Sequence, residues 1–293
     1  MYVPVAEVTA HENYALSLRF SADGRELYSA GMDRYIKRWS FPELKCLQAV
    51  AAHDNSVNSL AIAPRAGILV SGSTDTTVRY WTLPDLRPLR TLSGHKKTVA
   101  AVRVSPQEDL VASASYDSRV RLWSLPEGRS LPTISAHQRN VVGLAFSADG
   151  MTLASGGLGE EVMISEVATG KTLHALGGHR DAAIALAYSP DGSHLLSIDV
   201  ALTLRLWNAR TWQVDQQVQL PAKRAQSLSS SPLRDVFALG ADHRILLLSW
   251  ETLNIVEELP VKPMAVPAVA FSPDGLYLAA GFADQKIRVW QKG

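Results

Sequence analysis

The sequence contains a single cysteine, Cys46, among its 293 residues. One cysteine excludes an internal disulfide and suits a reducing compartment, so we expect a cytoplasmic protein. No stretch reaches the roughly 18 apolar residues of a membrane span, and the start, MYVPVAEVTAH, lacks the basic and apolar segments of a signal peptide. The net charge is only +1, which gives no indication of nucleic acid or an anionic membrane as a partner.

Catalytic and metal-binding motifs are missing as well. The chain has no Gly-x-Ser-x-Gly, Cys-x-x-Cys or His-Glu-x-x-His motif and no phosphate-binding glycine loop. The glycine-rich stretch Gly156–Gly159 leads into no predicted helix, and the adjacent Glu160 and Glu161 are expected on a solvated hairpin. We therefore expect no catalytic residue, no metal and no cofactor.

The sequence does contain an internal repeat. The stretch Gly94–Trp123 includes a histidine, a serine, an aspartate and a tryptophan, and related stretches recur at a step of 42 residues. Seven such steps cover nearly the whole chain, and a period of this length is typical of repeat architectures. The full set of four occurs three times: His11, Ser29, Asp33 and Trp39; His53, Ser71, Asp75 and Trp81; His95, Ser113, Asp117 and Trp123.

The later repeats keep only part of this set. The fourth has Gly159 and Ser165 in the aspartate and tryptophan positions, and the fifth has Ala201 in the aspartate position with Asp199 two residues earlier. The sixth repeat is the most degraded. We expect repeats 4, 6 and 7 to depend on apolar packing. The members that remain are His137, Ser155, His179, Ser197, Trp207, Asp284 and Trp290.

Short strands are predicted throughout. Apolar and polar residues alternate with period two and are interrupted by turns, which in the first repeat places strands at 15–20, 26–30, 35–39 and 45–49. Turns of the form SADG or SPDG, as at Ser189–Gly192, provide tight reversals. No segment has a sustained helical stripe, so we predict an all-β fold. Because one flat sheet of about 28 strands would not be stable, radial repetition into a β-propeller is favoured.

The chain resembles the WD-repeat β-propeller family over its whole length. The resemblance rests on the His–Ser–Asp–Trp spacing, the SPDG turns, and strands such as LVASAS and RVRLW, although the Trp-Asp dipeptide itself is absent. It implies one seven-bladed propeller of four-stranded antiparallel blades spanning residues 1–293, with residues 2–9 supplying the outer strand of the last blade. It also implies that each full set of four is a structural hydrogen-bond tetrad. Equivalent histidines lie in different blades and do not converge on a metal.

In the family that the chain resembles, partners commonly dock on the face that carries the hairpins between the second and third strands. The positions involved lie three and five residues after the histidine and one before the aspartate. Here they are largely apolar, which favours a protein interface, although some of these side chains could instead fill the mouth of the channel. The predicted partner-binding residues are Tyr14, Leu16, Met32, Tyr116, Val142, Leu158, Ile184, Val200, Arg224 and Pro267.

Basic residues follow the histidine positions of repeats 3 to 6. This predicted basic rim comprises Lys96, Lys97, Arg139, Arg180, Lys223 and Arg224. The main prediction is a non-enzymatic scaffold or adaptor that binds a protein or peptide within a larger complex. The alternative is a subunit of a nucleic-acid-associated complex that uses the basic rim, with nucleic acid bound weakly or indirectly. A propeller hydrolase with a site in the central channel is a remote alternative, and no membrane partner is expected.

Overall fold

The computed structural model describes residues 1–293 except 222–223, 233–234 and 262–263. Every regular element in these described residues is a β-strand, as the alternation in the sequence predicted. The strands belong to two compact units, each described here by itself: residues 1–60 with 222–293, and residues 61–221.

The first unit contains three four-stranded sheets. We call them blade 1 (β2–β5), blade 6 (β21–β24) and blade 7 (β25–β27 with β1). Their strands are β1 (Tyr2–Thr9), β2 (Ala15–Phe20), β3 (Glu26–Gly31), β4 (Tyr35–Ser40), β5 (Cys46–Ala51), β21 (Ala225–Ser230), β22 (Val236–Ala241), β23 (Arg244–Ser249), β24 (Ile255–Pro260), β25 (Ala268–Phe271), β26 (Tyr277–Gly281) and β27 (Lys286–Lys292).

The second unit contains blade 3 (β10–β12), blade 4 (β13–β16), blade 5 (β17–β20) and most of blade 2 (β6–β9). The strands are β6 (Val57–Ala63), β7 (Ile68–Ser73), β8 (Val78–Thr82), β9 (Pro88–Leu92), β10 (Val99–Val104), β11 (Leu110–Ser115), β12 (Val120–Ser124), β13 (Val141–Phe146), β14 (Thr152–Gly157), β15 (Val162–Glu166), β16 (Thr172–Leu176), β17 (Ala183–Tyr188), β18 (His194–Asp199), β19 (Thr203–Asn208) and β20 (Val214–Gln219).

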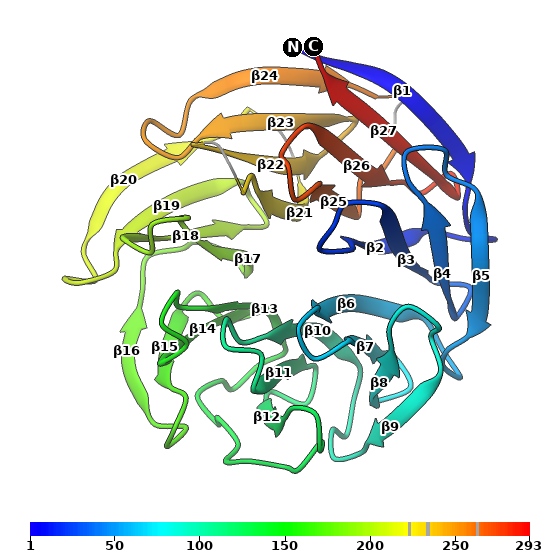
Figure 1. The fold of residues 1–293 in the computed structure, drawn as a ribbon. Helices are drawn as coiled ribbons and strands as arrows, with labels where there is room; N and C mark the ends of the chain where they lie inside the picture. Colours follow the sequence, from blue (N-terminus) through cyan, green and yellow to red (C-terminus); the bar gives the residue numbers. More distant parts are fainter. Residues whose placement is uncertain (222–223, 233–234, 262–263) are drawn as a thin grey trace. The chain divides into compact units, whose positions relative to one another are not determined.

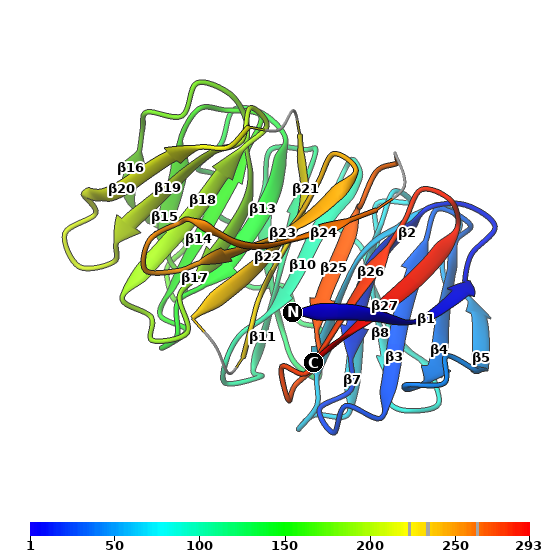
Figure 2. The same ribbon diagram turned by 90° about the horizontal axis from the view of Figure 1, so that it is seen from above.

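Six of the seven sheets follow the chain as simple antiparallel meanders. The seventh instead has the order β1-β27-β26-β25, so the first strand of the chain is the outer strand of the last blade. Figures 1 and 2 both show β1 running alongside β27 with the two chain ends adjacent. The fold class is therefore the all-β, seven-bladed propeller with a closure between the two ends of the chain, as predicted.

The closing strand β1 is held along its whole length. It pairs with β27 from Tyr2 opposite Lys292 to Thr9 opposite Lys286, with one irregularity between Pro4 and Ala6. The Tyr2 ring is buried, and its hydroxyl donates to the Gly275 carbonyl at 3.0 Å. These contacts remove an open sheet edge, which would otherwise be available for association with another chain.

Blade 3 is the exception to the four-stranded pattern. Its expected outer strand is reduced to isolated bridges, Val120 with Ile134 and Trp123 with Ser130. The Leu131 and Ile134 amides donate to the carbonyls of Leu122 and Val120, both at 2.9 Å. The outer strands of blades 1, 2, 4, 5 and 6 have a one-residue shift at the same place and still form ladders. What differs in blade 3 is Pro132, which has no N–H to donate.

Blade 1 shows why these sequences form strands. Leu18 of β2, Leu27 of β3 and Ile36 of β4 are fully buried, so each of the three inner strands contributes to the core. The outer strand β5 alternates between exposed and half-buried residues, as the period of a strand requires. The turn between β2 and β3 places Gly24 at φ 70°, a conformation that glycine adopts without strain. The strand predicted at 15–20 is confirmed, and those at 26–30 and 35–39 are each one residue longer.

Candidate functional site

The four marker residues of blade 1 form a continuous chain of hydrogen bonds. The Trp39 indole N–H donates to Ser29 Oγ at 2.8 Å, Ser29 Oγ lies 2.8 Å from His11 Nε2, and His11 Nδ1 lies 2.9 Å from the Asp33 carboxylate. The backbone N–H groups of Glu12 and Tyr35 also donate to Asp33, at 3.0 and 3.2 Å. These hydrogen bonds connect the loop before β2 to the hairpin between β3 and β4 and to the outer part of the blade.

Blade 3 repeats this geometry. His95 Nδ1 lies 2.9 Å from Asp117, His95 Nε2 lies 2.8 Å from Ser113 Oγ, and the Trp123 indole donates to the same Oγ at 2.9 Å. In blade 2 the Trp81 indole donates to Ser71 Oγ at 2.9 Å, and the Thr77 amide donates to Asp75 at 2.9 Å. His53 is buried, and its place in the tetrad remains the prediction that the repeat makes.

Blade 5 contains a complete tetrad that the fixed step of 42 residues missed. Asp199, and not Ala201, contacts His179 Nδ1 at 3.1 Å, while Ser197 and Trp207 complete the chain at 2.6 and 2.7 Å. A geometric reason is visible in blade 1, where the position equivalent to Asp199 is Gly31. A Cβ built on Gly31 would lie 2.6 Å from His11 Nδ1, so this position faces the histidine ring directly, and a side chain there requires the ring to sit further away than it does in blade 1.

Blades 6 and 7 are held differently. Trp250 in blade 6 packs against Phe237 with ring centroids 5.0 Å apart, and within the described residues its indole nitrogen is buried without a partner. In blade 7, Asp284 accepts from the Arg288 guanidinium at 2.5 Å, and Glu7 of β1 contacts both Arg288 and Lys286. The hydrogen bond from Lys286 is the main cause that lowers the pKa of Glu7.

A serine, a histidine and an aspartate in sequence have the connectivity of a hydrolytic triad. Here, however, Ser113 is 0% exposed and its Oγ already receives the Trp123 indole, so no substrate can reach it. Burial lowers the pKa of His95 despite the opposing hydrogen bond to Asp117, and the ring is therefore neutral at pH 7. The arrangement is suited to holding a blade together, since each orphaned member would cost about 1–3 kcal/mol.

The predicted apolar positions of the first unit are accessible at the hairpin end of blade 1. Tyr14 is 40% exposed and Met32 is 41% exposed, and the Met32 amide donates to the Tyr14 carbonyl at 3.0 Å, which brings the two together. Leu16 and Pro267 are partly buried. Tyr35, which starts β4 on the same hairpin, is 37% exposed. The sequence did not predict Tyr35 as a partner-binding residue, because the family positions used for that prediction end one residue before the aspartate.

The second unit shows a similar hairpin face. Tyr116 is 39% exposed and Leu158 is 45% exposed, whereas Val142, Ile184 and Val200 are partly buried. A cavity of about 490 Å³ opens beside Leu158, between the hairpin of blade 4 and the loop that leads into β17. His137 lines this cavity, and its Nε2 lies 2.8 Å from Ser155 Oγ.

The predicted basic rim is exposed wherever the structure describes it. Its described members are Lys96, Lys97, Arg139, Arg180 and Arg224, and Lys223 lies outside the described residues. No group of three or more residues able to hold a metal ion is found among the residues with described positions. Within that same part of the chain, no helix long and apolar enough to cross a membrane is present.

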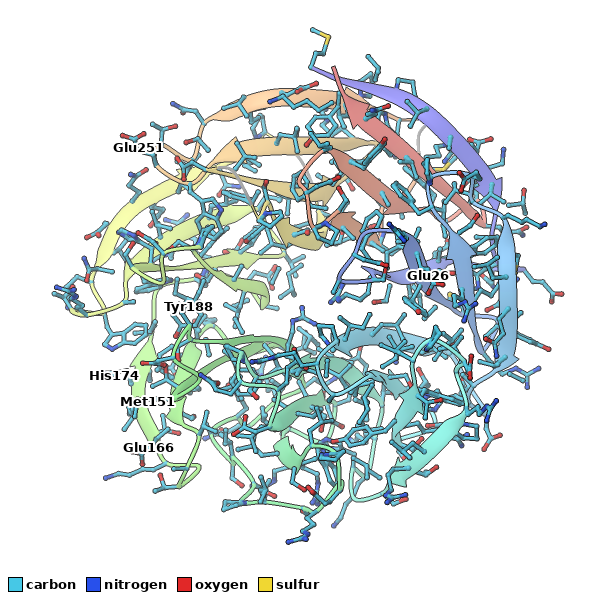
Figure 3. All side chains as sticks on the ribbon, viewed as in Figure 1. Glu26, Met151, Glu166, His174, Tyr188 and Glu251 are labelled. Atoms are coloured by element: carbon cyan, nitrogen blue, oxygen red, sulfur yellow. The ribbon has the colours of Figure 1, made fainter. Side chains whose placement is uncertain are left out.

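Exposed apolar side chains also occur away from the hairpin face. Met151, at the turn between β13 and β14, is 69% exposed, and Leu47 on the outer strand β5 is 43% exposed. Figure 3 shows Met151 and His174 towards the outer strands of blade 4. These side chains are single and scattered, as is usual on protein surfaces, whereas Tyr14, Met32 and Tyr35 are grouped at one hairpin.

Comparison with known proteins agrees with this architecture. Part of the chain is 34% identical over 88 residues to the mouse (Mus musculus) guanine nucleotide-binding protein subunit beta-like protein 1, and the aligned part is 27% of this chain and 27% of that relative. Six segments match the WD40 family, described as WD domain, G-beta repeat: residues 2–40, 44–82, 86–124, 128–164, 170–208 and 259–291. The unmatched stretch, residues 209–258, contains nearly all of blade 6, the most degraded repeat. The chain belongs to the WD40 repeat family.

Proposed function

We propose that this protein is a non-enzymatic interaction scaffold that binds a protein or peptide partner on its hairpin face, as a cytoplasmic subunit of a larger complex. The observation that carries the proposal is the group of exposed apolar side chains at the hairpin of blade 1: Tyr14 at 40%, Met32 at 41% and Tyr35 at 37%. Aromatic residues and methionine are favoured as anchors at protein interfaces.

The wider family supports the general role. WD40 propellers are typically interaction scaffolds and are generally non-catalytic. The mouse relative is named for its likeness to the beta subunit of a guanine nucleotide-binding protein, which is in keeping with a role in assemblies, and the chain aligns with 27% of its length. The buried Ser–His–Asp groups described above offer no accessible nucleophile, which also favours binding over catalysis.

The test changes Tyr14, Leu16 and Met32 together to serine, asparagine and glutamine. Partners captured from the native host would be identified by mass spectrometry with the wild-type protein and then measured with the variant. Since single anchor residues contribute more than 1 kcal/mol each at interfaces, we expect affinity to fall by about 100-fold or more.

The matched control is Leu47→Gln, which removes a side chain of similar exposure (43%) from the outer strand of the same blade. This control should keep the partner, and both proteins should have melting temperatures close to wild type. Full binding by the triple variant would move the interface to another surface. A salt-sensitive gel shift with nucleic acid that is lost on changing Lys96 and Lys97 would favour the nucleic-acid alternative.

A further inference from the structure

Blade 4 lacks the carboxylate that blades 1, 3 and 5 place against the histidine. Gly159 stands at the position of Asp33 and Asp117, and a Cβ built on it would meet no atom within 4 Å. The cavity of about 490 Å³ lies at this position. Its lining includes His137, Gln138, Arg139, Gly159, Glu161 and Arg180.

In blades 1 and 3 the same three donors hold the carboxylate. They are the histidine Nδ1, the backbone N–H of the next residue, and the backbone N–H two positions after the aspartate. In blade 3 the last two are Lys96 at 2.9 Å and Arg119 at 3.0 Å from Asp117.

In blade 5 the Thr203 amide, at the position equivalent to Arg119, donates to Asp199 at 2.8 Å although that carboxylate comes from an earlier residue. Two of the three donors, the histidine Nδ1 and this amide, are therefore reached by a carboxylate that comes from a different residue.

Blade 4 retains the counterparts of all three donors: His137 Nδ1 and the amides of Gln138 and Glu161. In the described chain none of them donates to a carboxylate, and His137 is held only through Nε2 by Ser155 Oγ at 2.8 Å. The hairpin is also wider than in blade 3. Its ladder ends at Ser155 opposite Met163, whereas the ladder of blade 3 continues to Ala114 opposite Val120, one pair closer to the tip.

The charges around the cavity are mixed. Arg139 and Arg180 are exposed and have no ion pair within the described ranges, while Glu160, Glu161 and Asp181 are exposed acids. Water and salt screen exposed charges strongly, whereas hydrogen bonds to an ionised acceptor act at contact distance and are among the strongest available. Burial lowers the pKa of His137 to about 4, so its ring is neutral at pH 7. In the tautomer whose Nε2 accepts from Ser155, the ring proton lies on Nδ1 and is available for donation.

We propose that this cavity of blade 4 binds a carboxylate supplied by a partner, which takes the place of the missing aspartate. The carboxylate accepts hydrogen bonds from His137 Nδ1 and from the Gln138 and Glu161 amides, and Arg139 and Arg180 offset the repulsion from the acids at the rim, Glu160, Glu161 and Asp181. Leu158, 45% exposed at the rim, provides an apolar contact for the residue beside the acid. This proposal deepens the proposed function. It rests on that function in one respect, namely that the carboxylate belongs to a bound protein or peptide.

The first experiment uses acetate as the probe. The imidazole resonances of the isotopically labelled protein are followed by NMR while sodium acetate replaces sodium chloride at constant ionic strength. The His137 signals should shift and saturate, with half-saturation on the order of 10 mM for so small a ligand. His95 is the internal control, because Asp117 already occupies its donors. No shift at His137, or a shift no larger than that of His95, overturns the proposal.

Two substitutions at Gly159 separate a carboxylate site from a solvent-filled cavity. The G159D variant restores the carboxylate within the chain and should weaken the acetate response about tenfold or more. The G159A variant adds a methyl group into open space and should retain the response. Since Gly159 is not among the residues with positive φ, neither change strains the backbone. An undiminished response in G159D contradicts the proposal.

Two short peptides then identify the source of the carboxylate. One is blocked at both ends and carries a central glutamate beside a leucine; the other has no acidic side chain but a free C-terminal carboxylate. The peptide that shifts His137 at lower concentration than acetate identifies the source, and failure of both to improve on acetate overturns recognition of a peptide acid. These measurements do not involve Tyr14, Leu16 or Met32. The carboxylate site and the proposed docking face can therefore fail independently.

Discussion

A carboxylate beside a buried histidine can be supplied from two positions in this repeat. In blade 1, Asp33 occupies the expected position, and in blade 5, Asp199 performs the same role from two residues earlier. The hairpin backbone is otherwise alike, because Arg34 and Leu202 at equivalent positions have φ of 74° and 63°. The position of the donors, more than the residue number, therefore decides which acid completes the tetrad.

This equivalence predicts the effect of moving the acid. Asp199→Ala orphans the Nδ1 proton of His179 and the amide of Thr203, and we expect the free energy of unfolding to fall by about 1–3 kcal/mol. Adding Ala201→Asp should restore a large part of this loss, because Ala201 lies where the other repeats place the acid.

Urea unfolding of the two single variants and the double variant forms the cycle that measures this coupling. Ala201→Asp alone should give no gain, since it sets a second negative charge beside Asp199. A double variant as unstable as Asp199→Ala would show that blade 5 does not share the donor geometry of blade 1.

The same residues show what sequence could predict at this scale. A fixed step of 42 residues found the tetrads of blades 1 and 3, because their hairpins have equal length and the acid keeps one position. It could not assign Asp199 to the tetrad, since the step treats each position separately and takes no account of which side chains reach one nitrogen. For the same reason the empty position at Gly159 was visible in the sequence, but the cavity beside it was not.

At the scale of elements, strand positions followed from alternation and turns. The range 2–9 predicted for the closing strand is confirmed. It could be predicted because its apolar alternation and the histidine that follows it match the outer strands of other repeats. The outer segment of blade 3 matched that pattern too, yet it forms only isolated bridges. Here the missing N–H of Pro132 outweighs the pattern, and a count of apolar residues does not detect that loss.

The closing strand offers the clearest prediction for an element. Deleting residues 1–9 removes the pairing with β27 and the buried Tyr2 ring, and leaves an open edge. We expect the melting temperature to fall by roughly 10 °C or more, on a scale of about 2–4 °C per kcal/mol for domains of somewhat smaller size, together with self-association detected by light scattering.

Glu7→Gln is the matched control within the same strand. It removes the ion pairs with Lys286 and Arg288 but keeps the strand, and exposed pairs of this kind contribute about 0–1 kcal/mol. A deletion variant that remains monomeric with an unchanged melting temperature would show that β1 does not close the last blade.

At the scale of the whole molecule, the repeat gave the number of blades and the family, because each step supplies one sheet. It also placed the chain closure, since an outer strand precedes the first histidine. It did not give the accessible surface, since exposure at the hairpins depends on how each loop packs. Tyr35 illustrates this limit: its exposure comes from its place on the hairpin, and no spacing rule selected it.

The closure also predicts that the chain tolerates a new starting point. The Gly293 amide donates to the Met1 carbonyl at 3.0 Å, so a short glycine-serine linker can join the two ends without disturbing β1 or β27. New ends placed between Thr169 and Gly170, in the turn between β15 and β16, interrupt no strand. Because the joined chain keeps every sheet pairing, we expect this circular permutant to melt within about 5 °C of the original protein.

A second permutant opened at Ala154, buried in the middle of β14, should fail to fold. Calorimetry of the two permutants gives the comparison, and failure of the permutant opened between Thr169 and Gly170 to fold would contradict the prediction.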